Sequence, residues 1–179
     1  VGAVGPRLMR PDGSIQRSCL RYVTLPGLLA GFVQGGDYLP ADPTTPAQVE
    51  ALSGAALMVR RQVVKEVGLL DEAFFMYAED TDWCYRMARA GWDIHYCPTA
   101  TVIHIGGQSA NQVPIETYVR RRMAQLQFMQ KHGPAGHARI AEQLMRLNLT
   151  LRARRAQGEE RAYYERVRSR FEEQVCGVG

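Results

Sequence analysis

The segment 74–86 most constrains how this chain can fold, because an aromatic run leads directly into three carboxylates. Glu79, Asp80 and Asp82 repel one another and lose water beside large apolar side chains, so their crowding indicates a functional site. Apolar residues then recur at helical spacing up to a glycine, which predicts a helix over residues 80–90. A cluster of acids at the start of this helix is therefore the first candidate site.

These acids also have a purely structural interpretation. Asp80 or Thr81 could cap the helix by accepting a free backbone N–H, and Asp82 stands four residues before Arg86, where the two can pair. The helix dipole favours ionised carboxylates at its N-terminus, and a fixed, partly dry carboxylate can take a proton from a hydroxyl. Capping and catalysis are compatible, so both interpretations stay open for Glu79 and Asp80.

A histidine beside a glycine pair is the second candidate. His104 lies between Ile103 and Ile105, so we expect it to face the opposite side of its strand. A lone histidine is more often a hydrogen-bonded core residue, but the following glycines, 106–107, allow a ligand to approach the backbone and add support for a metal or phosphate ligand, so both interpretations stay open. Trp83 could stack on a sugar ring, or it could belong to the core with the neighbouring aromatics.

The remaining elements follow from periodicity and from turn residues. Residues 14–38 read as irregular, and residues 39–49, with three prolines, read as an exposed loop. Residues 1–10 read as the end of a strand and a turn. The expected strands are residues 49–59, 92–97 and 100–105, the last two separated by a turn at Pro98. The expected helices are residues 60–67, 80–90, 115–131, 135–156 and 159–175.

Charge divides the chain into two parts. Residues 1–114 hold 9 basic and 11 acidic residues, a net charge of −2, whereas residues 115–179 hold 13 and 7, a net charge of +6. The basic helical tail could meet anionic lipid headgroups, or it could be a packed extension or an oligomer contact. Little aromatic interleaving accompanies these arginines, which disfavours nucleic acid as a partner.

Cysteine spacing disfavours a zinc site. The four cysteines contain no C-x-x-C pair, and scattered thiols of this kind are typical of a reducing compartment. The chain starts with Val1 inside a strand-like run, from which we expect the natural protein to extend upstream.

Several short motifs occur together, in one order and at consistent spacing. They are residues 1–8, 11–13, 53–60, 67–80, 82–86, Gly91, Pro98 and His104. Over roughly residues 1–130 this pattern resembles the second, acceptor-side half of the family 2 glycosyltransferases, and within them a rhamnosyltransferase-like group that builds cell-surface polysaccharides. The resemblance implies an α/β class: the C-terminal part of a GT-A (Rossmann-like) nucleotide-diphospho-sugar transferase fold with a mixed sheet. On this basis we expect the glycosyltransferase part at residues 1–132 and a helical extension at 133–179.

The resemblance also implies roles for the candidate residues. Asp80 matches the base that deprotonates the acceptor hydroxyl, and Glu79 would position the acceptor or orient Asp80. His104 matches the histidine that helps to hold a divalent metal, Mg or Mn, with the donor diphosphate. Ser53 and Gly54 match a small strand beside the acceptor.

The implied reaction is an inverting transfer from a nucleoside-diphosphate sugar to a saccharide or lipid-linked acceptor. Trp83 matches a position whose side chain can line the acceptor pocket. The implied location is cytoplasmic, with the inner face of the membrane as one alternative.

Two departures from the family pattern limit this interpretation. The nucleotide-binding half with its Asp-x-Asp metal motif is absent, so we expect no sugar transfer by this chain alone. The Gln-x-x-Arg-Trp motif of processive synthases is also absent after His104, which favours the transfer of one sugar. A non-catalytic carbohydrate- or partner-binding domain on the same scaffold is the alternative. An incomplete sheet could also associate with a second copy through its exposed edge.

Overall fold

The computed structural model describes residues 1–34, 41–106 and 113–177, which form two compact units. Unit 1 comprises Val1–Tyr22 and Leu39–Gln108, and unit 2 comprises Val23–Tyr38 and Ser109–Gly179. Each unit has its own hydrophobic core, so each is described by itself. The motifs described above fall almost entirely in unit 1.

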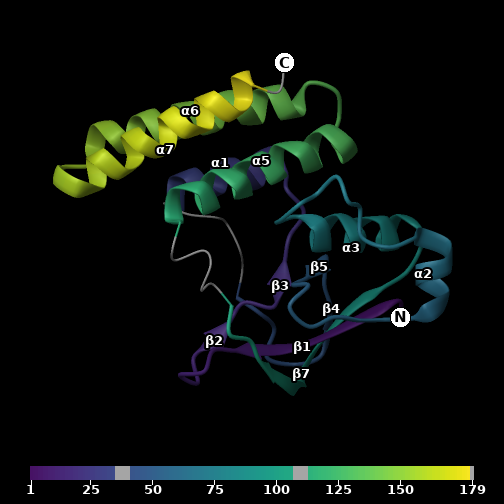
Figure 1. The fold of residues 1–179 in the computed structure, drawn as a ribbon. Helices are drawn as coiled ribbons and strands as arrows, with labels where there is room; N and C mark the ends of the chain where they lie inside the picture. The colour runs from purple at the N-terminus through teal and green to yellow at the C-terminus, as the bar shows by residue number, and fades with distance from the viewer. Residues whose placement is uncertain (35–40, 107–112, 178–179) are drawn as a thin grey trace. The chain divides into compact units, whose positions relative to one another are not determined.

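A mixed sheet forms the base of unit 1 (Figure 1). Its order is β2 (Ile15–Gln16), β1 (Ala3–Met9), β7 (Ile94–Ile103) and β4 (Ala47–Gln48), and β6 (Met58–Val59) also pairs with β1. The central strands β1 and β7 run parallel, whereas β2, β4 and β6 are antiparallel to their partners. This mixture of parallel and antiparallel pairs confirms the expected α/β class with a mixed sheet.

A second layer packs on this sheet. It contains the two-stranded ladder of β3 (Cys19–Leu20) and β5 (Ala51–Leu52), followed by α2 (Arg61–Val67) and α3 (Glu79–Arg89). The apolar side of α3 closes the core, because Cys84 and Met87 are fully buried. The buried residues that share this core are Ala3, Cys19, Ala51, Leu52, Val63, Cys84, Met87, Ile94 and Tyr96.

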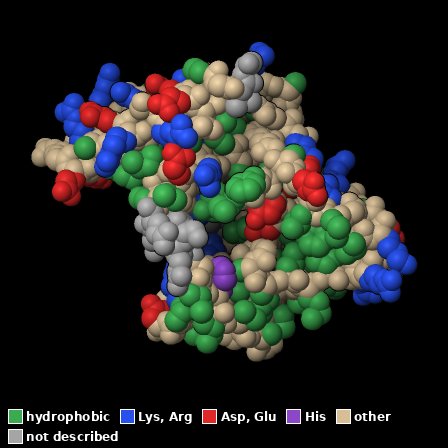
Figure 2. All heavy atoms as spheres, in the orientation of Figure 1, with side chains coloured by type: hydrophobic (Ala, Val, Ile, Leu, Met, Phe, Trp, Pro, Cys, Tyr) green, Lys and Arg blue, Asp and Glu red, His purple; other side chains and the backbone are tan. Residues whose placement is uncertain are grey.

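Unit 2 is helical. It consists of α1 (Leu25–Gln34), α5 (Pro114–His132), α6 (His137–Arg155) and α7 (Gly158–Cys176). The buried side chains at its centre are Leu28, Val119, Leu126, Met129, Ala141, Met145, Leu149, Val167 and Phe171. No helix among the described residues is long and apolar enough to cross a bilayer. On the face in Figure 2, Lys and Arg side chains are spread along α6 and α7.

All five predicted helices are confirmed, with ends within two or three residues of those expected. The glycines expected to end the helices α2 and α3 are also confirmed. Gly68 and Gly91 have φ values of 83° and 85°, a left-handed conformation that glycine adopts without strain. In unit 2, α5 groups with the later helices rather than with the sheet. The division into a transferase part at 1–132 and an extension at 133–179 stays a prediction.

Four strand and loop expectations are wrong. The segment 14–38 contains β2, β3 and α1; the helix was missed because Pro26 and glycines lower its propensity, while burial of Leu28 stabilises it. The segment 49–59 is two short strands separated by a turn, and the expected loop at 39–49 contains β4, its first two residues lying outside the described ranges.

The fourth error concerns β7. One continuous strand replaces the two expected strands, and Pro98 lies within it where the pairing with β1 shifts register. Partners change from Pro6 and Cys97 to Arg7 and Thr101 across this irregularity. Since proline cannot donate to a ladder, a bulge is where a strand accommodates it.

Candidate active site

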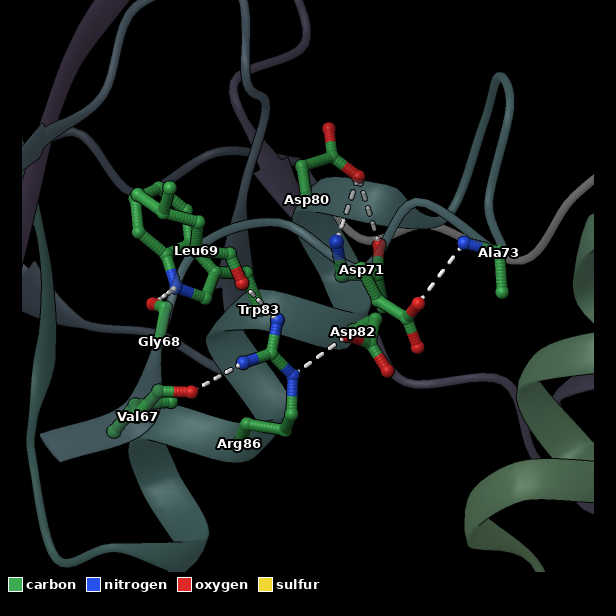
Figure 3. A network of polar contacts seen from close by, with 10 residues as sticks. Val67, Gly68, Leu69, Asp71, Ala73, Asp80, Asp82, Trp83 and Arg86 are labelled. Carbon is green, nitrogen blue, oxygen red and sulfur yellow. Dashed lines mark hydrogen bonds and ion pairs between the residues drawn. The ribbon is translucent and has the colours of Figure 1, made fainter. Parts of the chain in front are cut away.

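Asp80, which Figure 3 shows at the start of α3, is fixed in the first turn of that helix by three donors. Its Oδ2 accepts the backbone N–H of Gly54 at 2.9 Å, and its Oδ1 accepts the backbone N–H of Thr81 at 2.7 Å and the Thr81 hydroxyl at 3.2 Å. The N-cap position is Ala78, which makes no side-chain cap bond, so neither Asp80 nor Thr81 is the N-cap residue, although Asp80 accepts the N–H of Thr81 within the first turn. The carboxylate instead connects α3 to a segment 26 residues earlier.

Gly54 is required by the closeness of this contact. A Cβ atom built on Gly54 would lie 3.3 Å from the Asp80 Cβ, so a larger residue would displace the carboxylate or the turn. The preceding Ser53 donates its N–H to the Ser18 carbonyl at 2.8 Å, and its hydroxyl accepts the N–H of Ala55 at 3.3 Å. The structure therefore brings Gly54 and Asp80 together, which no local sequence signal could predict.

The backbone immediately before the acids is strained. Tyr77 and Ala78 have φ values of 70° and 63°, in the left-handed region that residues with a Cβ seldom occupy. Such conformations cost about 1–3 kcal/mol each and cluster at functional sites, where the surrounding structure holds them. Here they turn the chain from the aromatic run into α3 and so place Glu79 and Asp80 at its start.

The Glu79 carboxylate is only partly satisfied. Its Oε2 is buried and has no hydrogen-bond partner among the described residues. Burial raises the pKa of this carboxyl above its ordinary value, and the negative charge of Asp80 adds to the rise, while a backbone hydrogen bond at Glu79 opposes it. Buried oxygens without a partner are uncommon in native proteins, so we infer that Glu79 Oε2 accepts a hydrogen bond from a bound ligand.

The predicted ion pair between Asp82 and Arg86 is confirmed. Arg86 Nε donates to Asp82 Oδ2 at 2.8 Å, and the Asp82 side chain is fully buried. The same guanidinium donates to the carbonyls of Val67 and Leu69 at 2.7 Å each (Figure 3). Arg86 thus ties the loop that follows α2 to the body of α3, which keeps the approach to the acids in one conformation.

Trp83 completes this attachment. Its indole N–H donates to the Gly68 carbonyl at 2.9 Å. Side chains of α3 therefore bind three consecutive carbonyls, from the last residue of α2 to Leu69. The ring is half-buried and packs against the core of unit 1. Its contacts are those of the core interpretation, and its role as a wall of an acceptor pocket stays a prediction.

His104 lies just past the end of β7. Its backbone N–H donates to the Met9 carbonyl at 2.9 Å, and its Nδ1 is 3.2 Å from Gln16 Oε1. A Cβ on Gly106 would lie 2.3 Å from the His104 ring, so this glycine makes room for the imidazole itself. Gly107 lies outside the described residues.

Metal binding finds limited support in this part of the chain. Within residues 1–34, 41–106 and 113–177, no three His, Cys, Asp or Glu side chains gather in a way that could hold a metal ion. His104 supplies one imidazole, whereas a divalent ion such as Mg or Mn requires several oxygen ligands. The described residues alone therefore do not form the expected metal site.

Comparison with known proteins adds the family context. Residues 44–127 match the family model described as "Glycosyltransferase like family 2". The chain is 36% identical to the N-acetylglucosaminyl-diphospho-decaprenol L-rhamnosyltransferase of Mycobacterium tuberculosis, over 63% of this chain and 40% of that protein. It is 32% identical to the low-salt glycan biosynthesis hexosyltransferase Agl10 of Haloferax volcanii, over 60% and 30% of the two chains.

A third relative is the dTDP-rhamnosyl transferase RfbF of Shigella flexneri, 28% identical over 50% of this chain and 33% of that protein. The chain therefore spans less than half the length of each of these relatives. No solved structure matches it significantly.

Proposed function

We propose that the chain forms the acceptor-side part of an inverting glycosyltransferase, because residues 44–127 match the glycosyltransferase family 2 model and the chain is similar to rhamnosyltransferases. The observation that carries this proposal is the Asp80 carboxylate, which Gly54 and Thr81 hold at the start of α3. A base must be fixed before it can accept a proton in a defined direction. The neighbouring carboxyl of Glu79, with its unpaired buried oxygen, gives the same place a second polar group for a substrate.

In the proposed reaction, Asp80 takes the proton from one acceptor hydroxyl. The oxygen attacks the anomeric carbon of the donor sugar, and the bond to the nucleoside diphosphate breaks on the opposite face. The sugar is thereby transferred with inversion, and the diphosphate leaves with the electron pair. Each oxygen of a carboxylate offers two lone-pair directions, so the bonds to Gly54 and Thr81 leave capacity for the hydroxyl.

Glu79 would position the acceptor. With its pKa raised by burial, this carboxyl keeps a proton to higher pH than an ordinary glutamate, and it can exchange a hydrogen bond with a sugar hydroxyl. Ser53, beside Gly54, and Trp83, on the next turn of α3, are the further residues proposed to contact the acceptor. Holding hydroxyl and base together contributes to catalysis by orientation.

The substrates are proposed from the names of the relatives. Two of them are named as rhamnosyltransferases, one acting on an N-acetylglucosaminyl-diphospho-lipid. We propose a nucleoside-diphosphate sugar as donor and a saccharide or lipid-linked acceptor in cell-surface polysaccharide synthesis, at the cytoplasmic side of the membrane. A divalent metal would neutralise the leaving diphosphate, and His104 would contribute to a site whose other ligands lie outside the described residues.

The basic helices of unit 2 are proposed to contact anionic lipid. Arg154 and Arg155 are exposed at the end of α6, whereas Arg152 donates to Asn148 and to the Tyr164 hydroxyl at 3.1 and 3.0 Å. Arg152 therefore serves packing between α6 and α7. Liposome flotation should weaken when Arg154 and Arg155 become Gln, and unchanged flotation would favour the packed-extension alternative.

A non-catalytic carbohydrate- or partner-binding domain on the same scaffold is the competing proposal. One experiment distinguishes the glycosyltransferase proposal from the binding-domain proposal. The chain, extended upstream in its natural reading frame, is incubated with labelled nucleoside-diphosphate sugars and a lipid-linked saccharide, with and without a chelator. We expect metal-dependent transfer by the extended chain and none by the 179 residues alone.

The matched control is Asp80→Asn in the extended chain, which we expect to bind donor normally but to lose transfer. Glycan binding without any turnover, in the extended chain as well, would favour the binding domain. Robust turnover by the 179-residue chain would contradict the proposal that it is only the acceptor-side part.

A further inference from the structure

The helix α6 carries apolar side chains on two opposite sides. One side packs inside unit 2 against α1, α5 and α7, and its buried residues are Ala141, Met145, Leu149 and Ala153. The other side presents an apolar stripe, spaced by four, three and four residues so that its members share one face of the helix, formed by Ile140, Leu144, Leu147 and Leu151. A helix at a protein surface normally has polar residues opposite its buried side, so α6 departs from the usual pattern.

The apolar stripe of α6 is exposed along most of its length. The exposed fractions are 50% for Ile140, 54% for Leu147 and 37% for Leu151, and Leu144 is half-buried. The helix α7 provides a comparison, because it also has 19 residues and packs against α6. Within α7, which is described over its whole length, no Val, Leu or Phe side chain is exposed. Contiguous apolar side chains at a surface mark an interaction site.

The charges around the stripe have one sign. The exposed positions of α6 outside the stripe are Arg139, Gln143, Arg154 and Arg155. In total α6 contains five arginines and one glutamate, whereas α7 contains four arginines and five glutamates. The single glutamate of α6, Glu142, is bound to Arg146 at 2.9 Å and is not exposed. The exposed side of α6 therefore combines apolar and positively charged side chains and has no carboxylate.

These charges select one of the two partners that could cover the stripe. Its spacing is also that of a coiled-coil seam, which a second copy of the chain could complete. In coiled coils, the positions beside the seam commonly hold opposite charges on the two helices. Two copies of α6 would instead bring arginines together, in a parallel or an antiparallel arrangement. Anionic lipid suits both features, because its headgroups match the arginines and its acyl chains match the stripe.

We propose that α6 lies in the plane of an anionic bilayer surface and inserts its apolar stripe between the headgroups and the acyl chains. Arginine has an apolar stem, so Arg139, Arg154 and Arg155 can lie beside the stripe while their guanidinium groups bind lipid phosphates. The inference rests on the proposed contact of unit 2 with lipid and deepens it, because the stripe contributes a part of the binding that salt does not screen.

Flotation of the 179-residue chain with vesicles tests this inference. The vesicles contain equal parts of phosphatidylglycerol and phosphatidylcholine, and the partition coefficient is measured for the parent and for the double variant Leu147→Ser, Leu151→Ser. We expect binding by the parent and a partition coefficient about tenfold lower in the serine variant, because two leucine side chains are no longer transferred from water.

Two controls match this change. Leu147→Met with Leu151→Met keeps the stripe apolar, so it should partition like the parent. Val33→Ser removes an exposed apolar side chain from α1, which shares its core with the buried side of α6, and it should also leave partitioning unchanged. A change in the opposite direction is Gln143→Leu, which widens the stripe at an exposed position and should raise the partition coefficient about fivefold. This variant tests the inference even if the serine variant folds poorly.

Parental partitioning of the serine variant, or of Gln143→Leu, would overturn the inference. If Arg154→Gln with Arg155→Gln still weakened flotation in that case, the lipid contact would be electrostatic alone. Sedimentation equilibrium without vesicles tests the second copy as partner. We expect the parent and the serine variant to have the same mass, and a parent dimer that the serine variant converts to a monomer would assign the stripe to self-association. Since no sugar transfer is measured, these results are independent of whether Asp80 is the base.

Discussion

Glu79→Gln should make unit 1 more stable at neutral pH while it impairs the proposed reaction. In the folded chain one Glu79 oxygen is buried without a described partner, and burial raises the pKa of the carboxyl from its ordinary value of 4.5. An unsatisfied buried group costs about 1–3 kcal/mol. Since the Glu79 side chain is only partly buried, we take the lower end, about 1 kcal/mol.

The sign of the pH dependence follows from the same pKa. Because the folded state holds the Glu79 proton more tightly than the unfolded state does, its contribution to stability falls as pH rises through the interval above 4.5. Below that interval the carboxyl is neutral in both states, so glutamate and glutamine should be nearly equivalent. The advantage of Glu79→Gln should therefore be near zero at acid pH and reach about 1 kcal/mol at neutral pH.

Urea unfolding followed by tryptophan fluorescence measures this difference, because Trp83 and Trp92, the two tryptophans of the chain, both lie in unit 1. Glu72→Gln is the control, since Glu72 is an exposed glutamate of the preceding loop, and it should leave the unfolding free energy unchanged. A Glu79→Gln variant that is less stable at neutral pH, or whose advantage does not vary with pH, would refute the reasoning.

Three further predictions test neighbouring contacts. Gly54→Ala should lower the transfer rate of the extended chain about tenfold, because its Cβ would lie 3.3 Å from the Asp80 Cβ; a parental rate would show that the carboxylate needs no such fit. Arg86→Ala should lower the unfolding free energy by about 3–5 kcal/mol in urea, since it leaves a buried aspartate without its cation; a loss below about 1 kcal/mol would contradict this account of the ion pair. In the folded chain at pH 8, a thiol reagent should label Cys97, because hydrogen bonds from Thr99 and the backbone lower the pKa of its thiol. The reagent should not label Cys84, because this thiol is buried and burial raises its pKa to about 11. Mass spectrometry of the peptides measures both labels, and faster labelling of Cys84 than of Cys97 would contradict the prediction.

Local patterns predicted the helix that carries the acids. Its apolar spacing, its terminal Gly91 and the four-residue separation of Asp82 and Arg86 are all properties of one continuous segment, and all three are confirmed. The same is true of the tail helices, whose ends are marked by prolines and glycines. Periodicity and end signals act over a few residues, so a single sequence contains them in full.

Contacts between distant segments could not be predicted in this way. The bond from Gly54 to Asp80 spans 26 residues, and Asp42 accepts the N–H groups of Ser18 and Cys19, which precede it by 24 and 23 residues. The continuous β7 was missed for a related reason, since a bulge opposite β1 accommodates Pro98 only in the assembled sheet. The candidate base was therefore predictable from the residues and the family resemblance, whereas the groups that fix it were not.

The most direct test of the central proposal is the rate of sugar transfer by Asp80→Asn in the extended chain, at saturating donor and acceptor. Asparagine keeps the shape of the side chain and can still accept the N–H of Gly54, but it cannot take a proton. We predict a rate about 10²–10⁴-fold lower with donor affinity unchanged, the contribution expected of a general base. A rate within a few-fold of the parent would show that Asp80 is not the base.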